Sequence, residues 1–169
     1  KEFISQLWNH VNPYTGLAYK DEPAIVFTEV INENDFYCFP PKVPHYKEKL
    51  TKMYYQWMVD NNREIPENYD GCDNTDQAWE FRYSIQKKYF DEMIKYIKDI
   101  GVKIPIAGTN YQTTNATMQT MVNCDFADGH YYLYEFGLWN EYVKGIDQRC
   151  MMAQRNNMLL VGQTIEGKP

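Results

Sequence analysis

The residues best suited to chemistry follow an apolar run near the start of the chain. Residues 24–35, AIVFTEVINEND, are rich in β-branched side chains and end in two amides and two acids. Because the apolar residues are too continuous for a strand with one wet face, the pattern predicts a buried parallel strand. Polar groups that act in parallel α/β folds lie at the carboxyl ends of strands, so we expect a catalytic amide at Asn32 and a catalytic carboxylate at Glu33. The alternative is a polar strand exit that leads into a turn.

Two later segments repeat this apolar run with a polar end. Residues 102–108 are predicted to form a short strand that leads into Asn110, and residues 124–136 a third strand that carries His130 and Tyr132. Asn110 either lines a binding site or merely closes its strand. We expect His130 to be a pocket histidine rather than a metal ligand, because the chain has three His and no HxH or HExxH motif.

No cofactor is expected. The chain lacks a GxGxxG or GxxxxGK[ST] motif after a strand, which argues against an open α/β domain with a nucleotide at the strand ends. No metal site is predicted, since the acidic loop before residue 76 lacks the spacing of a calcium-binding EF-hand. The four cysteines are widely spaced without a CxxC pair, so we expect free thiols, with two disulfides as the alternative.

Helices must position these strand ends. Apolar residues at helical spacing predict helices near 1–11, 45–61 and 76–100, and a shorter one between the second and third strands. The longest has Asp76 as its expected cap and Gly101 as its left-handed stop. Since Gly101 leads directly into the strand at 102–108, the connection is typical of a parallel helix-to-strand unit. Glu29 shares a strand face with Glu33, and we expect a structural acid bonded to a neighbouring Lys or Tyr.

Composition and charge restrict the class of protein. At 169 residues, with 44% hydrophobic and 24% charged, the chain is an ordinary globular sequence with one domain or part of one. The net charge of -6, without a basic stripe, disfavours a nucleic-acid partner. No apolar run approaches the roughly 20 residues needed to cross a bilayer, so no membrane partner is expected. The first residue is Lys and no signal peptide is visible, so a processed or excised chain is one interpretation, and a cytoplasmic or secreted location is left open.

Strands with polar ends, separated by helices, are the pattern of a (β/α) barrel. The segments NPYTGLAYKDEPAIVFTEVINEND, GVKIPIAGTN and CDFADGHYY together resemble the middle of a clan A glycoside hydrolase. These are (β/α)8-barrel retaining enzymes that include cellulase-like and β-galactosidase-like families. The resemblance covers nearly the whole chain. It implies an α/β fold in which residues 1–169 are one segment of a partial (β/α)8 TIM barrel, about strands four to six with their helices and a parallel sheet, truncated at both ends.

The resemblance also implies roles for individual residues. The fourth strand of the clan ends in Asn-Glu, so Glu33 would be the general acid/base and Asn32 would bind the sugar 2-hydroxyl. The sixth strand often ends in His-x-Tyr, matched here by His130 and Tyr132, which with Asn110 would contact the carbohydrate substrate. The implied function is retaining hydrolysis of O-glycosidic bonds in a β-linked oligo- or polysaccharide, with two carboxyl groups about 5–5.5 Å apart.

The chain departs from the clan in one respect. The nucleophilic Glu of the clan lies at the end of the seventh strand, which this chain does not reach, and Glu166 stands in a turn-like context and is assigned no role. We therefore expect the middle portion of a larger enzyme, inactive alone. A truncated barrel exposes strand edges, so self-association, or a complex with the missing parts, is predicted.

A competing hypothesis belongs to another class of protein. The same residues would fit a non-catalytic α/β domain that binds a carbohydrate or a partner and borrows barrel repeats. Substitution of Glu33 in the full-length parent separates the two, because only an enzyme loses hydrolysis.

Overall fold

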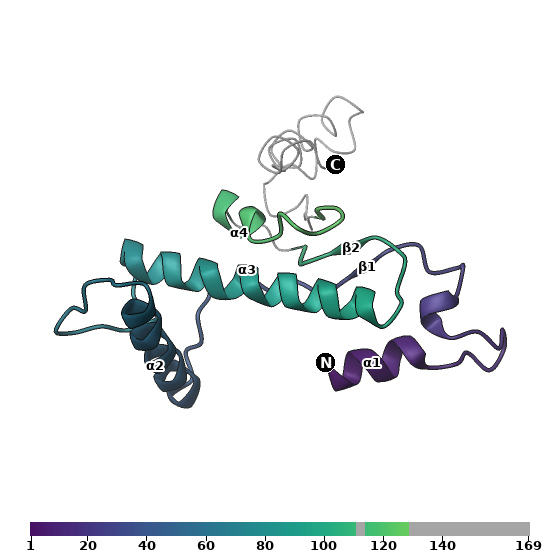
Figure 1. The fold of residues 1–169 in the computed structure, drawn as a ribbon, viewed down its shortest axis with the longest axis horizontal. Coiled ribbons are helices and arrows are strands. Elements are labelled where there is room, and N and C mark those ends of the chain that lie inside the picture. The colour runs from purple at the N-terminus through teal and green to yellow at the C-terminus, as the bar shows by residue number, and fades with distance from the viewer. Residues whose placement is uncertain (111–113, 129–169) are drawn as a thin grey trace, which may run out of the picture.

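The computed structural model describes residues 1–110 and 114–128, and this part of the chain is mostly helical (Figure 1). A 3-10 turn at Tyr19–Asp21 follows the first helix. The other elements are, in chain order, α1 (Glu2–Asn9), β1 (Thr28–Glu29), α2 (Pro44–Asp60), α3 (Asp76–Asp99), β2 (Ile106–Ala107) and α4 (Asn115–Gln119). Figure 1 shows the long helix α3 running past both strands, with α2 near its first turns.

The two strands form a parallel pair, with Thr28 opposite Ile106 and Glu29 opposite Ala107. Backbone hydrogen bonds continue past the strand ends, since the N–H of Ile31 donates to the carbonyl of Gly108 at 3.1 Å. Helices α2 and α3 connect one strand to the other, as a parallel pair requires. The carboxyl ends of both strands therefore lie at the same edge of the sheet.

The predicted partial TIM barrel is wrong for the described residues. A segment with strands four to six needs three paired strands, whereas the described sheet has two strands of two residues each. The third predicted strand was expected at 124–136. Residues 124–128 form no strand, and 129–136 lie outside the described residues.

The prediction of a fully buried strand at 24–35 is also wrong. Regular pairing is limited to Thr28 and Glu29, and the side chains of Val26 and Phe27 are 67% and 61% exposed. A strand is buried on both faces only when helices or further strands cover both. In the described part of the chain this segment packs on the core through residues such as Ile25, whereas Val26 is mostly exposed and Phe27 contacts the Phe126 ring at its edge.

One apolar cluster joins the C-terminal half of α3 to α1 and the sheet. Its buried members are Trp8, Phe90, Ile94, Ile97, Val102, Ile106, Met121 and Cys124. The stripe predicted on α3 is confirmed at Phe90, Ile94 and Ile97. The stripe predicted on α1 is confirmed only at Trp8, because Phe3 on the same helix is exposed. Helix α1 therefore packs on the core mainly through one aromatic ring.

A second apolar cluster joins α2 to the first turns of α3. Leu50, Tyr54 and Met58 of α2 are buried against Ala78 and Phe81 of α3. The apolar residues at helical spacing that predicted this helix are thus buried at these three positions. Burying side chains of this size contributes about 1.5–3 kcal/mol each, so this contact is enough to fix α2 on α3.

The predicted bounds of the longest helix agree with the structure within one residue. Helix α3 covers Asp76–Asp99, and Gly101 has a φ of +98°, as expected of a left-handed stop. The predicted cap is wrong by one position, because the hydroxyl of Thr75 accepts the Ala78 N–H at 3.2 Å. Thr is also among the residues preferred at this position.

Asp70 stabilises the joint between α2 and α3. Its carboxylate accepts hydrogen bonds from the Thr51 hydroxyl at 3.1 Å and the Cys72 N–H at 2.9 Å, and pairs with the Lys47 ammonium. Burial raises the pKa of Asp70, but the hydrogen bonds from Lys47, Cys72 and Thr51 outweigh burial and hold the pKa below its ordinary value.

Replacing Asp70 by Asn is expected to lower the free energy of unfolding near neutral pH by about 1 kcal/mol, because a charged acceptor is lost. Since the folded-state pKa lies below the unfolded value of about 3.9, this contribution is present above that pH and is lost as the pH falls through the folded pKa. Urea unfolding near neutral pH and near pH 3 measures both effects. The exposed neighbour Asp73, changed to Asn, is the control. Equal acid sensitivity of wild type and Asp70→Asn would contradict the assignment.

Candidate functional site

The candidate site is a group of polar side chains at the carboxyl ends of β1 and β2. Glu29, Asn32 and Glu33 come from β1 and its exit, and Asn110 from the exit of β2; we call these four residues the strand-end cluster. The N–H of Glu33 donates to Asn110 Oδ1 at 2.7 Å. The structure thus brings together Asn32, Glu33 and Asn110, which the sequence had placed at strand ends more than seventy residues apart.

Asn110 links all members of the strand-end cluster. Its Nδ2 donates to Glu29 Oε2 at 2.7 Å and to Asn32 Oδ1 at 3.0 Å, while its Oδ1 accepts the Glu33 N–H. Only 1% of Asn110 is exposed. A buried amide costs free energy unless it is hydrogen-bonded, and these three bonds satisfy it. Glu29 bonds this amide, and its expected bond to a Lys or Tyr stays a prediction.

Glu33 has an uncommon backbone for its residue type. Its φ is +45°, in the left-handed region that non-glycine residues seldom adopt. Such a conformation costs about 1–3 kcal/mol and persists where surrounding contacts hold it. Here the contacts are the bond from its own N–H to Asn110 and the next bond, from the Asn34 N–H to the Thr109 hydroxyl at 3.1 Å. Asn32 and Glu33 are themselves exposed, so a ligand can reach both side chains.

Sequence reasoning did not identify Asp35 as an anchor of the site. The Asp35 carboxylate is buried and accepts from the Thr117 hydroxyl at 2.8 Å and the Cys38 N–H at 3.3 Å. It therefore joins the loop after β1 to α4. The sequence shows only that Asp35 is an acid directly after the polar residues at the strand end. That pattern fits a buried acid that holds a loop as well as an acid in a solvated turn.

Two polar residues on the buried face of α3 were also missed. Gln86 accepts the Tyr37 N–H at 2.7 Å and donates to the Thr120 hydroxyl at 3.1 Å. The Arg82 guanidinium donates through Nε to the Tyr37 carbonyl at 3.0 Å and through Nη1 to the Gly71 carbonyl at 2.8 Å. Burial lowers the pKa of Arg82, but a guanidinium stays charged in proteins. These bonds hold the loop that follows Glu33 against α3.

A hollow of about 440 Å³ lies beside the loops that leave both strands. Tyr37 of the β1 loop and Thr114, after β2, line it together with Trp79 and Tyr83 of α3. Glu80, also from α3, and Asp76 complete its lining. The Trp79 ring contacts Tyr37, with ring centroids 4.8 Å apart. Aromatic rings with nearby carboxylates suit a ligand that has both apolar faces and hydroxyl groups.

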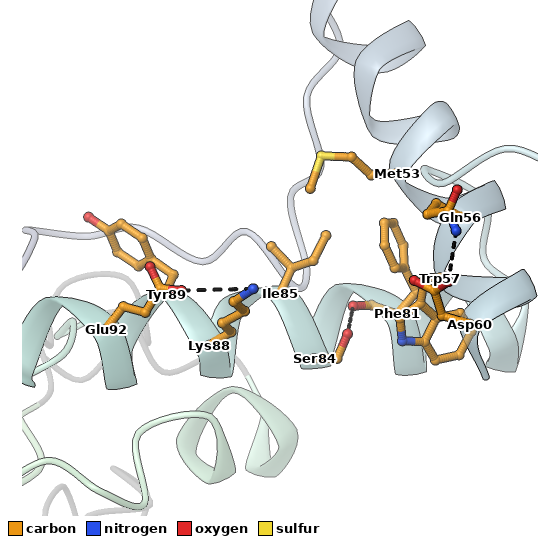
Figure 2. Close-up of a pocket in the computed structure, with 10 residues that line it drawn as sticks. All are labelled: Met53, Gln56, Trp57, Asp60, Phe81, Ser84, Ile85, Lys88, Tyr89 and Glu92. Atoms are coloured by element: carbon orange, nitrogen blue, oxygen red, sulfur yellow. Dashed lines mark hydrogen bonds and ion pairs between the residues drawn. The ribbon is translucent and has the colours of Figure 1, made fainter.

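A second hollow, of about 600 Å³, lies in the angle between α2 and α3 (Figure 2). Figure 2 shows an apolar lining that includes Met53 and Trp57 of α2 and Phe81 and Ile85 of α3. None of the strand-end cluster residues lines this hollow. It is therefore not part of the candidate site.

Two predicted site residues, His130 and Tyr132, lie outside the described residues, and their place in the site stays a prediction. Within residues 1–110 and 114–128, no group of His, Cys, Asp or Glu is placed to hold a metal ion. Cys38, Cys72 and Cys124 are free thiols, as predicted for them. None of the described helices is long and apolar enough to cross a membrane.

Gly108 allows the polar end of β2 to pass close to the core. A Cβ added to Gly108 would lie 2.7 Å from Met121 Sδ and 3.0 Å from Phe90 Cδ1. The N–H of the next residue, Thr109, already lies 3.2 Å from the same sulfur. The strand end is thus packed tightly beneath Asn110.

Gly108→Ala is expected to lower the free energy of unfolding by about 1–3 kcal/mol, because the added methyl overpacks this contact. Chemical denaturation measures the loss. A Met121→Ala background removes the two closest contacts and keeps the one with Phe90 Cδ1, so the same substitution should cost less there, and the two changes should be non-additive. An equal loss in both backgrounds would show that steric contact with Met121 is not the cause.

Comparisons with other proteins do not assign this site. No family model, no curated protein and no solved structure matches the chain. Function is therefore inferred from the strand-end cluster itself.

Proposed function

We propose that the strand-end cluster is the acid/base half of a retaining glycoside hydrolase site, acting on O-glycosidic bonds of a β-linked oligo- or polysaccharide. The observation that carries the proposal is an exposed Glu33 beside an exposed Asn32, both fixed from below by buried Asn110. The proposal concerns this site and does not depend on the barrel fold. It needs only an acid and an amide held side by side at one sheet edge.

In this proposal Glu33 acts twice. As an acid it donates its proton to the glycosidic oxygen while the bond from that oxygen to the anomeric carbon breaks. A carboxylate nucleophile attacks the same carbon and forms a glycosyl ester. Glu33, now a carboxylate, removes a proton from water, and the resulting hydroxide oxygen displaces the ester and releases the sugar.

Asn32 has a defined orientation for the sugar 2-hydroxyl. Its Oδ1 accepts from Asn110 Nδ2 at 3.0 Å, so its own Nδ2 is the donor left to meet a ligand oxygen. A hydrogen bond to the 2-hydroxyl strengthens in the transition state and contributes several kcal/mol in enzymes of this type. Asn32 and Glu33 would therefore act on neighbouring atoms of one sugar.

The aromatic hollow adds support for a carbohydrate ligand. Tyr37, which lines it, follows Glu33 by four residues along the loop that leaves β1. The aromatic rings that line the hollow offer flat apolar surfaces, and Asp76 and Glu80 offer acceptors for hydroxyl groups. A sugar unit next to the cleaved bond would find suitable chemistry there.

The nucleophile remains to be supplied. Retaining hydrolysis needs a second carboxyl group about 5–5.5 Å from the acid. We assign this second role to none of the described residues, and we propose that the chain alone does not turn over substrate.

Glu33→Gln, made in the complete polypeptide that carries these residues, tests the proposal. With an aryl β-glycoside that has a poor leaving group, kcat/KM should fall about 10²-fold to 10⁴-fold, since Gln cannot donate the proton. With a strongly acidic phenol as leaving group, bond breaking needs little protonation, and kcat/KM should fall much less. Steady-state kinetics over a series of phenols measures this dependence.

Glu67→Gln is the matched control, because Glu67 is an exposed acid on the loop between α2 and α3. It should leave both substrates unaffected. Near-normal hydrolysis of the substrate with the poor leaving group by Glu33→Gln would remove Glu33 from the mechanism. Sugar binding without hydrolysis by the wild type would favour a non-catalytic carbohydrate-binding domain.

We also propose that the chain self-associates through the segment just before β1, where the side chains of Val26 and Phe27 are mostly exposed. Light scattering of the chain should show a mass that rises with concentration. Phe27→Lys should reduce the rise, because a charge on a strand edge opposes pairing. Tyr14→Lys, at a fully exposed loop position, should not. A constant monomer mass for the wild type would contradict the proposal.

A further inference from the structure

We infer that Asn110 is a positioning residue, which sets the backbone of Glu33 and the amide orientation of Asn32 without contacting the sugar. The inference rests on the proposed function and deepens it. It changes the expected role of Asn110 from a substrate ligand to the group that fixes two substrate-facing residues.

Burial separates Asn110 from the residues it holds. Asn110 is 1% exposed, whereas Asn32 and Glu33 are exposed at the same strand ends. Both N–H groups of its amide have partners, Glu29 and Asn32. The side chain is buried, and a sugar hydroxyl would have to displace one of these bonds to accept a hydrogen bond from Asn110.

The orientation of the Asn110 amide is dictated by Glu29. A carboxylate only accepts hydrogen bonds, so the atom 2.7 Å from Glu29 Oε2 must be the Asn110 nitrogen. The Asn110 oxygen then faces the Glu33 N–H, and the second Asn110 hydrogen faces Asn32 Oδ1. Asn32 is left with its NH₂ group outward. One carboxylate below the site thus decides which atom of Asn32 the substrate meets.

The same amide holds Glu33 in its left-handed conformation. With φ at +45°, Glu33 has a backbone that most residues leave when their contacts are removed. The bond from its N–H to Asn110 Oδ1, at 2.7 Å, is charge-neutral and buried on the Asn110 side. Loss of that bond would let the Glu33 carboxyl group move relative to the scissile oxygen.

Asn110→Asp tests the inference in the complete polypeptide. Asp keeps an acceptor for the Glu33 N–H but has no hydrogen for Asn32 and faces Glu29 with a second negative charge. We expect kcat for a poor leaving group to fall about 10²-fold, the usual effect of a misplacement near 1 Å, with KM changed little. A residue that binds sugar would chiefly raise KM.

The double variant that combines Glu29→Gln with Asn110→Asp provides the rescue, because it exchanges the amide and the carboxylate. The new amide at position 29 would donate to the new carboxylate at position 110, and the Glu33 N–H would keep its acceptor. Asn32 would donate to the same carboxylate after its own amide flips. The double variant should restore the response to the leaving group, because that response depends on Glu33 and the Glu33 N–H keeps its acceptor. The flip turns the Asn32 oxygen outward, where it would accept a hydrogen bond from the 2-hydroxyl in place of donating one.

Asp70→Asn is the control, because it lowers stability at the joint between α2 and α3 and leaves the strand-end cluster in place. It should lower the melting temperature without changing the dependence on leaving group. If Asn110→Asp behaves in the same way as Asp70→Asn, or if the folded double variant shows no rescue, the inference is overturned. If Glu33→Gln is fully active, the proposed function fails as well; if Glu33→Gln is inactive and Asn110→Asp is normal, only the role of Asn110 fails.

Discussion

The parallel register of β1 and β2 is the constraint on which the site depends. Because Thr28 lies opposite Ile106, both strands end at the same edge of the sheet and at the same level along the strand direction. Asn110 then meets the exit of β1 at three atoms. A shift of one residue would turn each side chain to the other face of the sheet, and the Asn110 amide would lose all three partners.

Helix α3 supports this register from one face and fixes the loop beyond it. Phe90 and Ile94 pack beneath the sheet, and Gly108 lets β2 approach Phe90 closely. Earlier on the same helix, Arg82 and Gln86 bond the backbone of Tyr37. Polar bonds therefore order the loop next to Glu33, where apolar packing alone would leave its backbone groups unpaired.

The difference between the expected and the observed sheet has a physical reason. A run of apolar residues shows that a segment is able to be buried, but burial also needs neighbours on both faces. Val26 and Phe27 are as apolar as Ile25, yet only Ile25 packs against the core in the described part of the chain. The barrel was inferred from repeated strand-like runs, and the described residues pair only two of them.

The sequence by itself determined the local features. Apolar spacing predicted α2 and α3 within one or two residues, Gly101 marked the stop of α3, and polar residues at strand exits pointed to Asn32, Glu33 and Asn110. These depend on contacts between residues close in the chain, which periodicity and turn preferences record.

Only the tertiary structure decided how the site is built. It paired segments almost eighty residues apart, buried Asn110 while Asn32 and Glu33 stayed exposed, and connected Glu29 to both through one amide. Hydrogen bonds between distant polar side chains leave no periodic signal in a single sequence, because any of several Asn, Gln or Glu residues would fit the same pattern.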